Sequence, residues 1–292
     1  MSGPDHLDLA CGGARARVSA AGGELVAWRA GGHDLLWRPD PAFWSAAAPL
    51  LFPVVGWRAG GVARIGGRAF PMPVHGFAAS SRFTLTRLDE AGATARLTAD
   101  EATRAHYPFD FIFEAIYRLT ATELTVDLAV TNAGASAMPY ACGLHPGFAW
   151  PFAGGGRAAH RIVFAEAEDP FTPEIAPGGL FAPTRRRAPL EDRVLALTEE
   201  TFAREALCFL DARSDSLRFE GPGGAIVVTR AGFPHWALWS RPGAPFVCVE
   251  AWTGHGDPVG FAGELAEAPS MLSLPPGATA RHGASFRFAP GD

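Results

Sequence analysis

Short segments in which apolar and polar residues alternate, separated by glycine, proline and aspartate, place the strongest constraint on what this chain can fold into. Four such segments lie at residues 81–100, 109–132, 215–230 and 282–290. Each of the first two predicts a pair of strands, with the break of the second at residues 120–122, and the third predicts a hairpin around residues 221–224. With 34 glycines and 25 prolines, long helical periodicities are hard to find. The pattern predicts an all-β sandwich or barrel rather than a βαβ fold.

Residues 189–207 are an exception, because their mixed pattern allows a short helix. We find no internal repeat, low-complexity segment or linker with a change of composition, so we expect one domain over residues 1–292. Hydrophobic residues make up 48% of the chain and charged residues 19%. This composition supplies enough apolar surface for a sizeable core and predicts order over most of the length.

The charged residues exclude several classes of partner and chemistry. The formal net charge is -5, and the longest basic run is Arg185, Arg186 and Arg187, so we expect neither a nucleic-acid partner nor an anionic membrane partner. The chain contains no lysine, which excludes a lysine Schiff base and a P-loop.

The cysteines and the first residues of the chain bear on its cellular location. Cys11, Cys142, Cys208 and Cys248 are widely separated and form no CxxC pair, so we expect reduced and mostly buried thiols. The first residues lack a basic region followed by an apolar run, and no stretch approaches the roughly 20 apolar residues that a membrane span needs. We therefore expect a cytoplasmic protein without a signal peptide.

Three stretches place a titratable side chain among glycines and aromatic residues. They are "YACGLHPGFAWPF" with His145, "PMPVHGFA" with His75, and "PFVCVEAWTGHGDP" with Glu250. Glycine beside each histidine permits a tight turn and close backbone approach to a ligand, and aromatic residues such as Phe148 offer apolar platforms for a sugar ring. A binding cleft is one interpretation, and a buried histidine bonded to a neighbouring carbonyl is the alternative.

Glu250 follows an apolar run that predicts a buried strand, and it precedes Trp252 in the same stretch. Burying a carboxylate is costly unless it is paired or used in a site. Burial would raise its pKa toward the range of a general base, whereas a close imidazolium would lower that pKa. A glutamate on the exposed face of the strand is the alternative. For His235, near Trp236 and Trp239, a place in a cleft wall competes with ordinary packing.

Other chemistries lack their motifs. The sequence has no HExxH, no GxSxG and no GxGxxG after a strand. His75, His145 and Glu250 have no short-range spacing of the kind that metal ligands show, so we expect neither a metal nor another cofactor.

Taken together, these motifs resemble the aldose 1-epimerase (galactose mutarotase-like) family, especially its bacterial branch with an HGFAR-type motif. The resemblance runs along nearly the whole chain. The matching segments are "APLLFPVVGW" (48–57), "PVHGFA" (73–78), "GLHPGF" (143–148), "LWSRPGAPFVCVEAWTG" (238–254) and "MLSLPPGATARHGASFRF" (271–288).

The resemblance implies a large antiparallel β-sandwich in which one concave sheet holds the sugar. It also implies that Glu250 is the general base for the anomeric hydroxyl, that His145 is the general acid for the ring oxygen, and that His75 hydrogen-bonds the sugar nearby. Such chemistry needs an acid and a base and no cofactor. Whether His145 and Glu250 face each other across one pocket at a sugar-sized separation distinguishes an enzyme from a non-catalytic carbohydrate-binding protein. The expected substrate-binding residues are His75, Trp57, Arg58, Phe148, Trp252 and His235.

Two positions differ from the family pattern. Where the family has arginine after the glycine of its LFP segment, this chain has Trp57, with Arg58 one place later. Where the family has arginine after HGFA, this chain has Ala79, and the next arginine is Arg82. Neither an indole nor a methyl group replaces a guanidinium fork. We therefore expect a non-standard substrate or reduced activity, with Trp57 stacking on the sugar.

The leading hypothesis is an enzyme that interconverts the anomers of a free aldose or a related uronate or deoxy sugar. An epimerase for hexose 6-phosphates is one alternative, and it requires arginines that converge on the cleft; the candidates are Arg64, Arg68, Arg82 and Arg157. A non-catalytic carbohydrate-binding protein is the other. We expect a monomer or a homodimer whose partner is a small sugar, with no nucleic acid or membrane.

Overall fold

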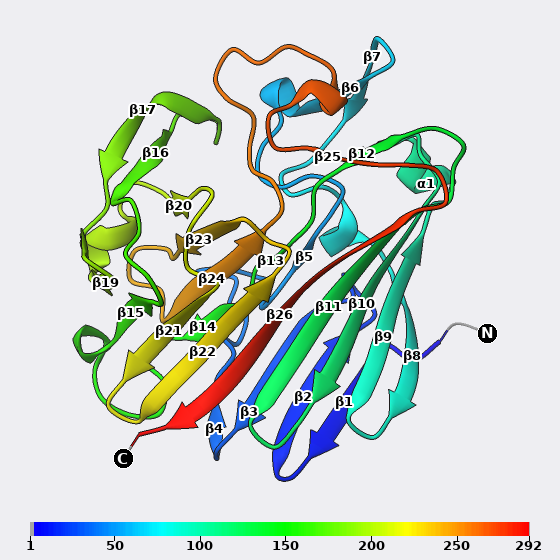
Figure 1. Ribbon diagram of the computed structural model, residues 1–292. Coiled ribbons are helices and arrows are strands. Elements are labelled where there is room, and N and C mark those ends of the chain that lie inside the picture. The colour runs from blue at the N-terminus through cyan, green and yellow to red at the C-terminus, as the bar shows by residue number, and fades with distance from the viewer. Residues whose placement is uncertain (1–2, 292) are drawn as a thin grey trace.

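A ten-stranded antiparallel sheet is the largest element of the computed structural model, which describes residues 3–291. Its strands run in the order β18 (Leu190–Glu191), β19 (Val194–Ala196), β15 (Arg161–Phe164), β21 (Ser216–Gly221), β22 (Gly224–Ala231), β26 (Thr279–Pro290), β11 (Glu123–Asn132), β10 (Phe111–Leu119), β9 (Gly92–Thr98) and β8 (Thr84–Asp89). In Figure 1 the long strands β22, β26, β11, β10 and β9 lie side by side. The strands expected in all four alternating segments are confirmed.

Two further sheets pack against this one. The four-stranded sheet comprises β1 (His6–Cys11), β2 (Ala14–Ser19), β3 (Leu25–Ala30) and β4 (His33–Asp34). The six-stranded sheet comprises β20 (Leu207–Phe209), β23 (His235–Trp239), β24 (Phe246–Trp252), β13 (Gly143–Leu144) and β5 (Leu50–Leu51), with β14 (Gly147–Ala149) also paired to β24. The predicted large antiparallel β-sandwich is confirmed.

Side-chain alternation explains how the layers share one core. Along β10, Phe111, Phe113, Ala115, Tyr117 and Leu119 are buried, while the residues between them are half-buried or exposed. Successive side chains of a strand point to opposite faces, so this pattern buries one face of the ten-stranded sheet. The buried face meets aromatic residues of the other sheets, and all belong to one hydrophobic cluster.

The same alternation gives strand β24 two apolar faces with different partners. Val247, Val249 and Ala251 belong to the main core. Glu250 and Trp252, on the opposite face, line a cavity. The six-stranded sheet therefore has its inner face on the core and presents its outer face to the candidate site.

Smaller elements complete the chain. Three two-stranded ribbons are β12 (Met138–Tyr140) with β25 (Leu272–Leu274), β16 (Phe171–Ile175) with β17 (Phe181–Arg187), and β6 (Val62–Ile65) with β7 (Arg68–Pro71). Short 3-10 helices cover Ala59–Gly61, Ala78–Ser80, Arg157–Ala159, Glu199–Phe202 and Leu265–Glu267.

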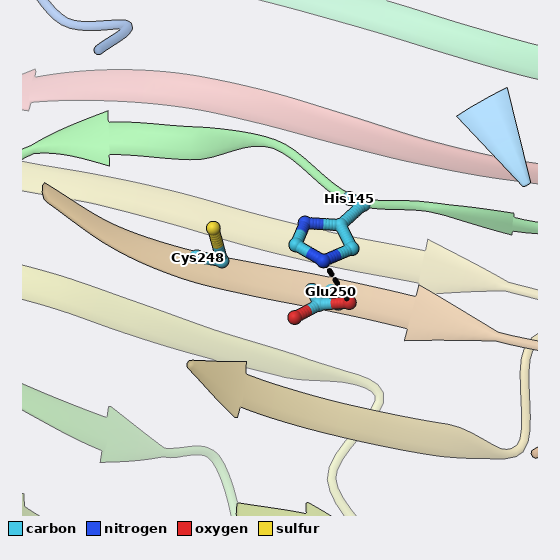
Figure 2. A group of neighbouring side chains, drawn as sticks. All are labelled: His145, Cys248 and Glu250. Carbon is cyan, nitrogen blue, oxygen red and sulfur yellow. Dashed lines mark ion pairs between the residues drawn. The ribbon is translucent and has the colours of Figure 1, made fainter. Parts of the chain in front are cut away.

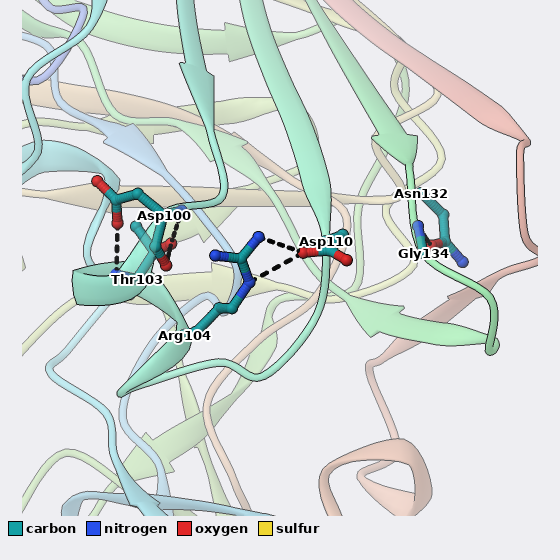
Figure 3. Close-up of polar contacts among 6 residues, drawn as sticks. All are labelled: Asp100, Thr103, Arg104, Asp110, Asn132 and Gly134. Atoms are coloured by element: carbon teal, nitrogen blue, oxygen red, sulfur yellow. Dashed lines mark hydrogen bonds and ion pairs between the residues drawn. The ribbon is translucent and has the colours of Figure 1, made fainter.

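The helix α1 (Glu101–Arg104) connects β9 to β10 and is fixed by its own polar contacts (Figure 3). Asp100 caps it by accepting a hydrogen bond from the Thr103 N–H at 2.8 Å, and the Thr103 hydroxyl accepts one from the Asp100 N–H. Arg104 then donates two hydrogen bonds to Asp110 at the start of β10. Gly134, after β11, donates its N–H to the buried side chain of Asn132.

The short helix that the pattern of residues 189–207 allows is limited to the 3-10 helix Glu199–Phe202. This segment forms β18, β19, a 3-10 turn and the first residue of β20. Leu195 and Leu197 are buried while Val194 and Ala196 are exposed, which is a period of two. Pairing of β19 with β15 at the edge of the ten-stranded sheet decides the conformation against the mixed local pattern.

Two other expectations bear on the whole chain. All four cysteines are free thiols; Cys142, Cys208 and Cys248 are buried and Cys11 is half-buried, as predicted. Among residues 3–291, no helix has the length and apolar character needed to cross a membrane.

Replacing Phe113 by alanine tests the shared core. Phe113 is fully buried and its ring stacks on that of Phe52 with centroids 4.6 Å apart. We expect the variant to lose about 3–5 kcal/mol of unfolding free energy, measured by urea denaturation, because the deletion leaves a cavity. Ile116→Ala, on the half-buried outer face of the same strand, is the control and should lose clearly less. Equal losses would contradict the assigned faces.

Candidate active site

His145 and Glu250 are in direct contact. Glu250 lies on β24, and His145 lies between β13 and β14, so the two side chains come from adjacent backbone segments (Figure 2). The distance between His145 Nε2 and Glu250 Oε2 is 3.1 Å, and both side chains are buried. The separation is shorter than a sugar: both groups line one cavity, but no substrate atom fits between these two atoms.

The sequence "HP" explains why His145 projects beside Glu250. Gly143 and Leu144 pair with the end of β24, and Gly147 pairs with Cys248 farther back. Pro146 has no N–H to donate and interrupts the ladder, although its carbonyl still accepts a hydrogen bond from Val249 at 3.1 Å. The interruption separates β13 from β14 at the position where His145 meets the carboxylate.

A cavity of about 470 Å³ lies above this pair. On its floor, Cys208 and Glu250 line the cavity from strands on either side of β23, where Ala237 pairs with both of them. Two small side chains beside the carboxylate leave space over the sheet. The walls include four indoles, those of Trp44, Trp57, Trp239 and Trp252. The volume and the aromatic lining are typical of a small-molecule site.

The two glycines that bracket His145 make room for indoles. A Cβ at Gly143 would lie 2.8 Å from Cδ1 of Trp252, and a Cβ at Gly147 would lie 2.9 Å from Cζ3 of Trp44. Neither glycine has a positive φ. The sequence suggested two reasons for glycine beside His145, a tight turn or a close approach to the backbone. The tight turn does not account for Gly143 and Gly147. The close approach of the two indoles to the backbone accounts for both.

Glu250 is held through one of its two oxygens. Oε2 accepts a hydrogen bond from Trp252 Nε1 at 3.1 Å and also contacts His145. Oε1 has no hydrogen-bond partner in the described part of the chain. Unlike the buried polar atoms that lack a partner, Oε1 remains accessible. Oε1 is therefore the oxygen open to the cavity.

Burial sets the protonation of the pair. It raises the pKa of Glu250 well above its usual range, and the hydrogen bond from Trp252 partly opposes this rise. It lowers the pKa of His145 well below its usual range, and the neighbouring His75 adds to the effect. In the empty site we therefore assign a protonated carboxyl group to Glu250 and a neutral imidazole to His145.

His75 approaches from the other side of the cavity, with its ring edge-on to that of His145 and centroids 5.5 Å apart. Its Nδ1 accepts a hydrogen bond from the Gly56 N–H at 3.1 Å, so the ring proton of the neutral form is on Nε2. Burial, followed by the charge of Arg58, lowers the pKa of His75 to about 4. Its φ of 62° is a left-handed backbone conformation, which is uncommon outside glycine and frequent at functional sites.

Of the other expected site residues, Trp57 and Trp252 line the cavity. Trp57 is 44% exposed, and its indole lies against the backbone of Gly179 in the turn between β16 and β17. This ribbon forms one wall of the cavity through Ile175 and Phe181.

Phe148 and His235 do not line the cavity. Phe148 is buried in the main core between Trp28 and Phe286, because alternation along β14 turns it away from the side occupied by Gly147. His235 is buried beside His255, and its Nδ1 accepts a hydrogen bond from the Asp211 N–H at 3.0 Å. For His235, the sequence left open a place in the cleft wall or ordinary packing, and the structure shows ordinary packing.

Arg58 does not reach the cavity either. Its side chain is buried and forms an ion pair with Asp257, with Nη1 and Oδ1 2.8 Å apart. It also donates to the carbonyls of Val55 and His255. Asp257 in turn accepts a hydrogen bond from the Ala59 N–H at 2.8 Å. Arg58 therefore ties the loop that carries Trp57 to the loop after β24.

The sequence did not single out several lining residues. Trp44 and Trp239 flank His145 with ring centroids at 5.1 and 5.8 Å, and Arg241 and Cys208 also line the cavity. Alternate residues of a strand share one face of the sheet. Once the strand register is known, this alternation places Cys208 and Trp239 on the same face of the sheet as Glu250. No local signal marks Trp44, which lies outside any named strand.

The arginines expected for a phosphorylated sugar do not converge on the cavity. Arg64, Arg68, Arg82 and Arg157 are absent from its lining, whereas Arg241 is present. Arg82 forms an exposed ion pair with Asp5, and the guanidinium of Arg157 lies 4.0 Å from the centroid of the Trp150 ring.

One group of side chains has a composition compatible with a metal ion. His145, Cys248 and Glu250 place one ligand atom each within 4.8 Å of one another (Figure 2). Burial raises the pKa of the Cys248 thiol well above its usual range, which holds it in the protonated form and opposes metal binding. The arrangement can transfer protons without a metal.

Comparisons with known proteins identify one family and one fold. The sequence model of the aldose 1-epimerase family matches residues 5–272. Protein LacX (chromosomal) of Lactococcus lactis subsp. lactis is 27% identical over 271 residues, which cover 87% of this chain and 90% of that protein. A galactose mutarotase related enzyme from Lactobacillus acidophilus is similar with a TM-score of 0.89 and 24% identity over 97% of both chains. A galactose mutarotase-like protein from Lactobacillus casei gives 0.90 and 23%, covering 97% of this chain and 100% of that chain.

Asp257→Asn tests the buried ion pair. Removing one partner leaves the Arg58 charge buried without compensation, so we expect the unfolding free energy to fall by about 3–5 kcal/mol in urea denaturation. Asp8→Asn, which breaks the exposed pair of Asp8 with Arg17, is the matched control and should change stability little. A fully stable Asp257→Asn protein would refute the loop-tying role of Arg58.

The depressed pKa of His75 predicts a loss of stability in acid. Between the ordinary value of 6.5 and about 4, the unfolded chain binds a proton at His75 that the folded protein does not. Stability should therefore fall as the pH drops through this window, by about 3 kcal/mol for this residue. His75→Asn, whose side chain tolerates the left-handed backbone, should show a correspondingly shallower dependence of unfolding free energy on pH. Parallel curves would contradict the assignment.

Proposed function

The chain belongs to the aldose 1-epimerase family, and on this premise we propose that it interconverts the α and β anomers of an aldose by acid–base ring opening and reclosure. The observation that carries the proposal is the buried contact between His145 and Glu250 on the wall of an indole-lined cavity. An acid and a base at one wall are what this reaction needs, and tryptophan faces suit the apolar faces of a pyranose.

In the proposed mechanism Oε1 of Glu250 accepts the proton of the anomeric hydroxyl, and Nε2 of His145 gives a proton to the ring oxygen. The C1–O5 bond breaks and an aldehyde forms at C1. Rotation about the C1–C2 bond presents the other face of the aldehyde, and the two proton transfers then reverse as the ring closes. The sugar and the protein return to their original proton counts, so the step balances without a co-reactant.

The 3.1 Å contact supplies the ionic form that the mechanism needs. The protonated carboxyl and neutral imidazole of the empty site hold the same number of protons as a carboxylate and an imidazolium. Moving one proton from Oε2 to Nε2 converts the first form to the second. The sugar must approach the pair from the cavity side, and His145 must exchange its contact with Glu250 for one with the ring oxygen.

The lining favours an unphosphorylated sugar. The candidate phosphate-binding arginines Arg64, Arg68, Arg82 and Arg157 lie outside the cavity, so Arg241 is the one arginine that lines it and no cluster of arginines forms there among the described residues. The Nε2–H of His75 is a donor suited to a sugar oxygen, and Trp57 offers an exposed aromatic face at the rim. We propose that His75 and Trp57 bind substrate in these ways, and that Arg58 acts only by fixing the loop of Trp57.

Anomer exchange measured by NMR saturation transfer tests the function on a panel of neutral aldoses, a uronate, a deoxy sugar and a hexose 6-phosphate. We expect wild-type protein to accelerate exchange for an unphosphorylated member. Glu250→Gln, which keeps the shape of the side chain, should reduce the acceleration by about 10²–10⁴-fold, because it removes the base. His145→Asn should do the same through loss of the acid.

Glu220→Gln, at a half-buried position of β21 that does not line the cavity, is the control and should match wild type. Sugar binding without faster exchange in the wild-type protein would reject the epimerase and establish the carbohydrate-binding alternative. Exchange confined to the hexose 6-phosphate would reject the assignment of an unphosphorylated substrate.

A further inference from the structure

Among the described residues, Trp252 is the one indole of the cavity that also hydrogen-bonds Glu250. It lines the cavity, and its Nε1 donates a hydrogen bond to Oε2 of Glu250 at 3.1 Å. The two residues lie two positions apart on β24, so strand alternation places both on the same face. The donor is therefore fixed by the same strand that carries the carboxylate.

The position of this indole is built into the neighbouring strand. Gly143 of β13 pairs with Trp252 across the ladder, and a Cβ at Gly143 would lie 2.8 Å from Cδ1 of the indole. The ring packs where only glycine leaves room for it. On the other side of His145, Trp44 occupies the corresponding space over Gly147 but makes no hydrogen bond to Glu250 within residues 3–291.

Both the Trp252 N–H and His145 engage the same oxygen, Oε2. The carboxyl group is thereby held in one rotation, with Oε1 left for the substrate. A hydrogen bond to a carboxylate also favours its ionised form over its protonated form. A phenyl ring in place of the indole would preserve the aromatic wall and remove both effects.

We propose that Trp252 is a positioning residue for Glu250: its indole N–H fixes Oε2, aims Oε1 at the anomeric hydroxyl and stabilises the ionised carboxylate. This inference rests on the proposed function for its catalytic consequence. Its electrostatic part concerns Glu250 alone and can be measured without a substrate.

The charged and titratable groups around Glu250 come from several elements. His145 contacts it directly, and the others that face the same cavity or adjoin it are His75, Cys208, Cys248, Glu205 and Arg241. Since His145 and Glu250 exchange one proton, the pH dependence of activity reports apparent pKa values of the pair. The fall in activity at alkaline pH, the alkaline limb of the profile, reports loss of the proton that His145 and Glu250 share.

The test compares wild type with Trp252→Phe in the pH profile of kcat/KM for anomer exchange. If the indole favours the ionised carboxylate, its removal raises the pKa of Glu250 by about one unit and lowers the population of the ionic pair about tenfold. We expect a tenfold lower plateau, an alkaline limb about one pH unit higher, and convergence of the two profiles above that limb. Loss of packing alone would lower the plateau without moving the limb, and this outcome would overturn the proposal.

A second readout does not depend on catalysis. The carboxyl infrared band of Glu250, identified as the band missing from Glu250→Gln, should persist to a pH about one unit higher in Trp252→Phe than in wild type. An unchanged midpoint would overturn the proposal. If wild-type protein exchanged no sugar, the proposed function would fail, and this titration would still decide whether Trp252 acts on Glu250.

Two further variants separate the hydrogen bond from general damage. Trp239→Phe removes another indole of the cavity, 5.8 Å from the His145 ring, and should leave the Glu250 midpoint unchanged. Gly143→Ala keeps the indole but forces it to move, and should raise the midpoint as Trp252→Phe does. If Trp239→Phe shifted the midpoint equally, the effect would belong to the cavity as a whole and the proposal would be wrong.

Discussion

A carboxylate buried at the middle of an apolar strand is the constraint on which the rest of the site depends. Placing Glu250 there is costly unless other groups satisfy it. The imidazole of His145 and the indole N–H of Trp252 do so at one oxygen, and burial holds the carboxyl group protonated when the cavity is empty. The proline that interrupts the neighbouring strand and the glycine that admits the indole both follow from this requirement.

The β-sandwich meets the requirement by giving one sheet two different apolar environments. Odd-numbered positions of β24 pack on the main core, and the even-numbered positions Glu250 and Trp252 line the cavity on the other side. The core fixes the strand, and the strand fixes the carboxylate. Loops then add the groups that the sheet does not supply, namely His75 and Trp57, and the buried pair of Arg58 and Asp257 holds the loop of Trp57 in place.

Periodicity in the sequence predicted the strands of this architecture. Local motifs predicted the main residues of the site. Alternation identified seven strands of the ten-stranded sheet, all except β15, β18 and β19, and His145, His75 and Glu250 do meet in one cavity. A motif does not, however, reveal which side of a strand faces the ligand. Phe148 follows His145 by three residues and nevertheless lies in the core, and Arg58 is adjacent to Trp57 and is nevertheless buried against Asp257. Within residues 189–207, where the sequence allowed a helix, Val194–Ala196 form a strand because pairing with a distant strand outweighed local preference.

The β16–β17 ribbon has a consequence for how this site can change. It borders the cavity through Ile175 and Phe181, and its turn at Gly179 lies against Trp57, yet it contributes neither member of the proton-transferring pair. Inserting one residue in β24 would turn Glu250 into the core and abolish the chemistry. Lengthening or shortening the ribbon would reshape only the entrance. A change in the size of the ligand that the cavity accepts therefore disturbs the rest of the site least at residues 171–187, because these residues leave His145 and Glu250 in place.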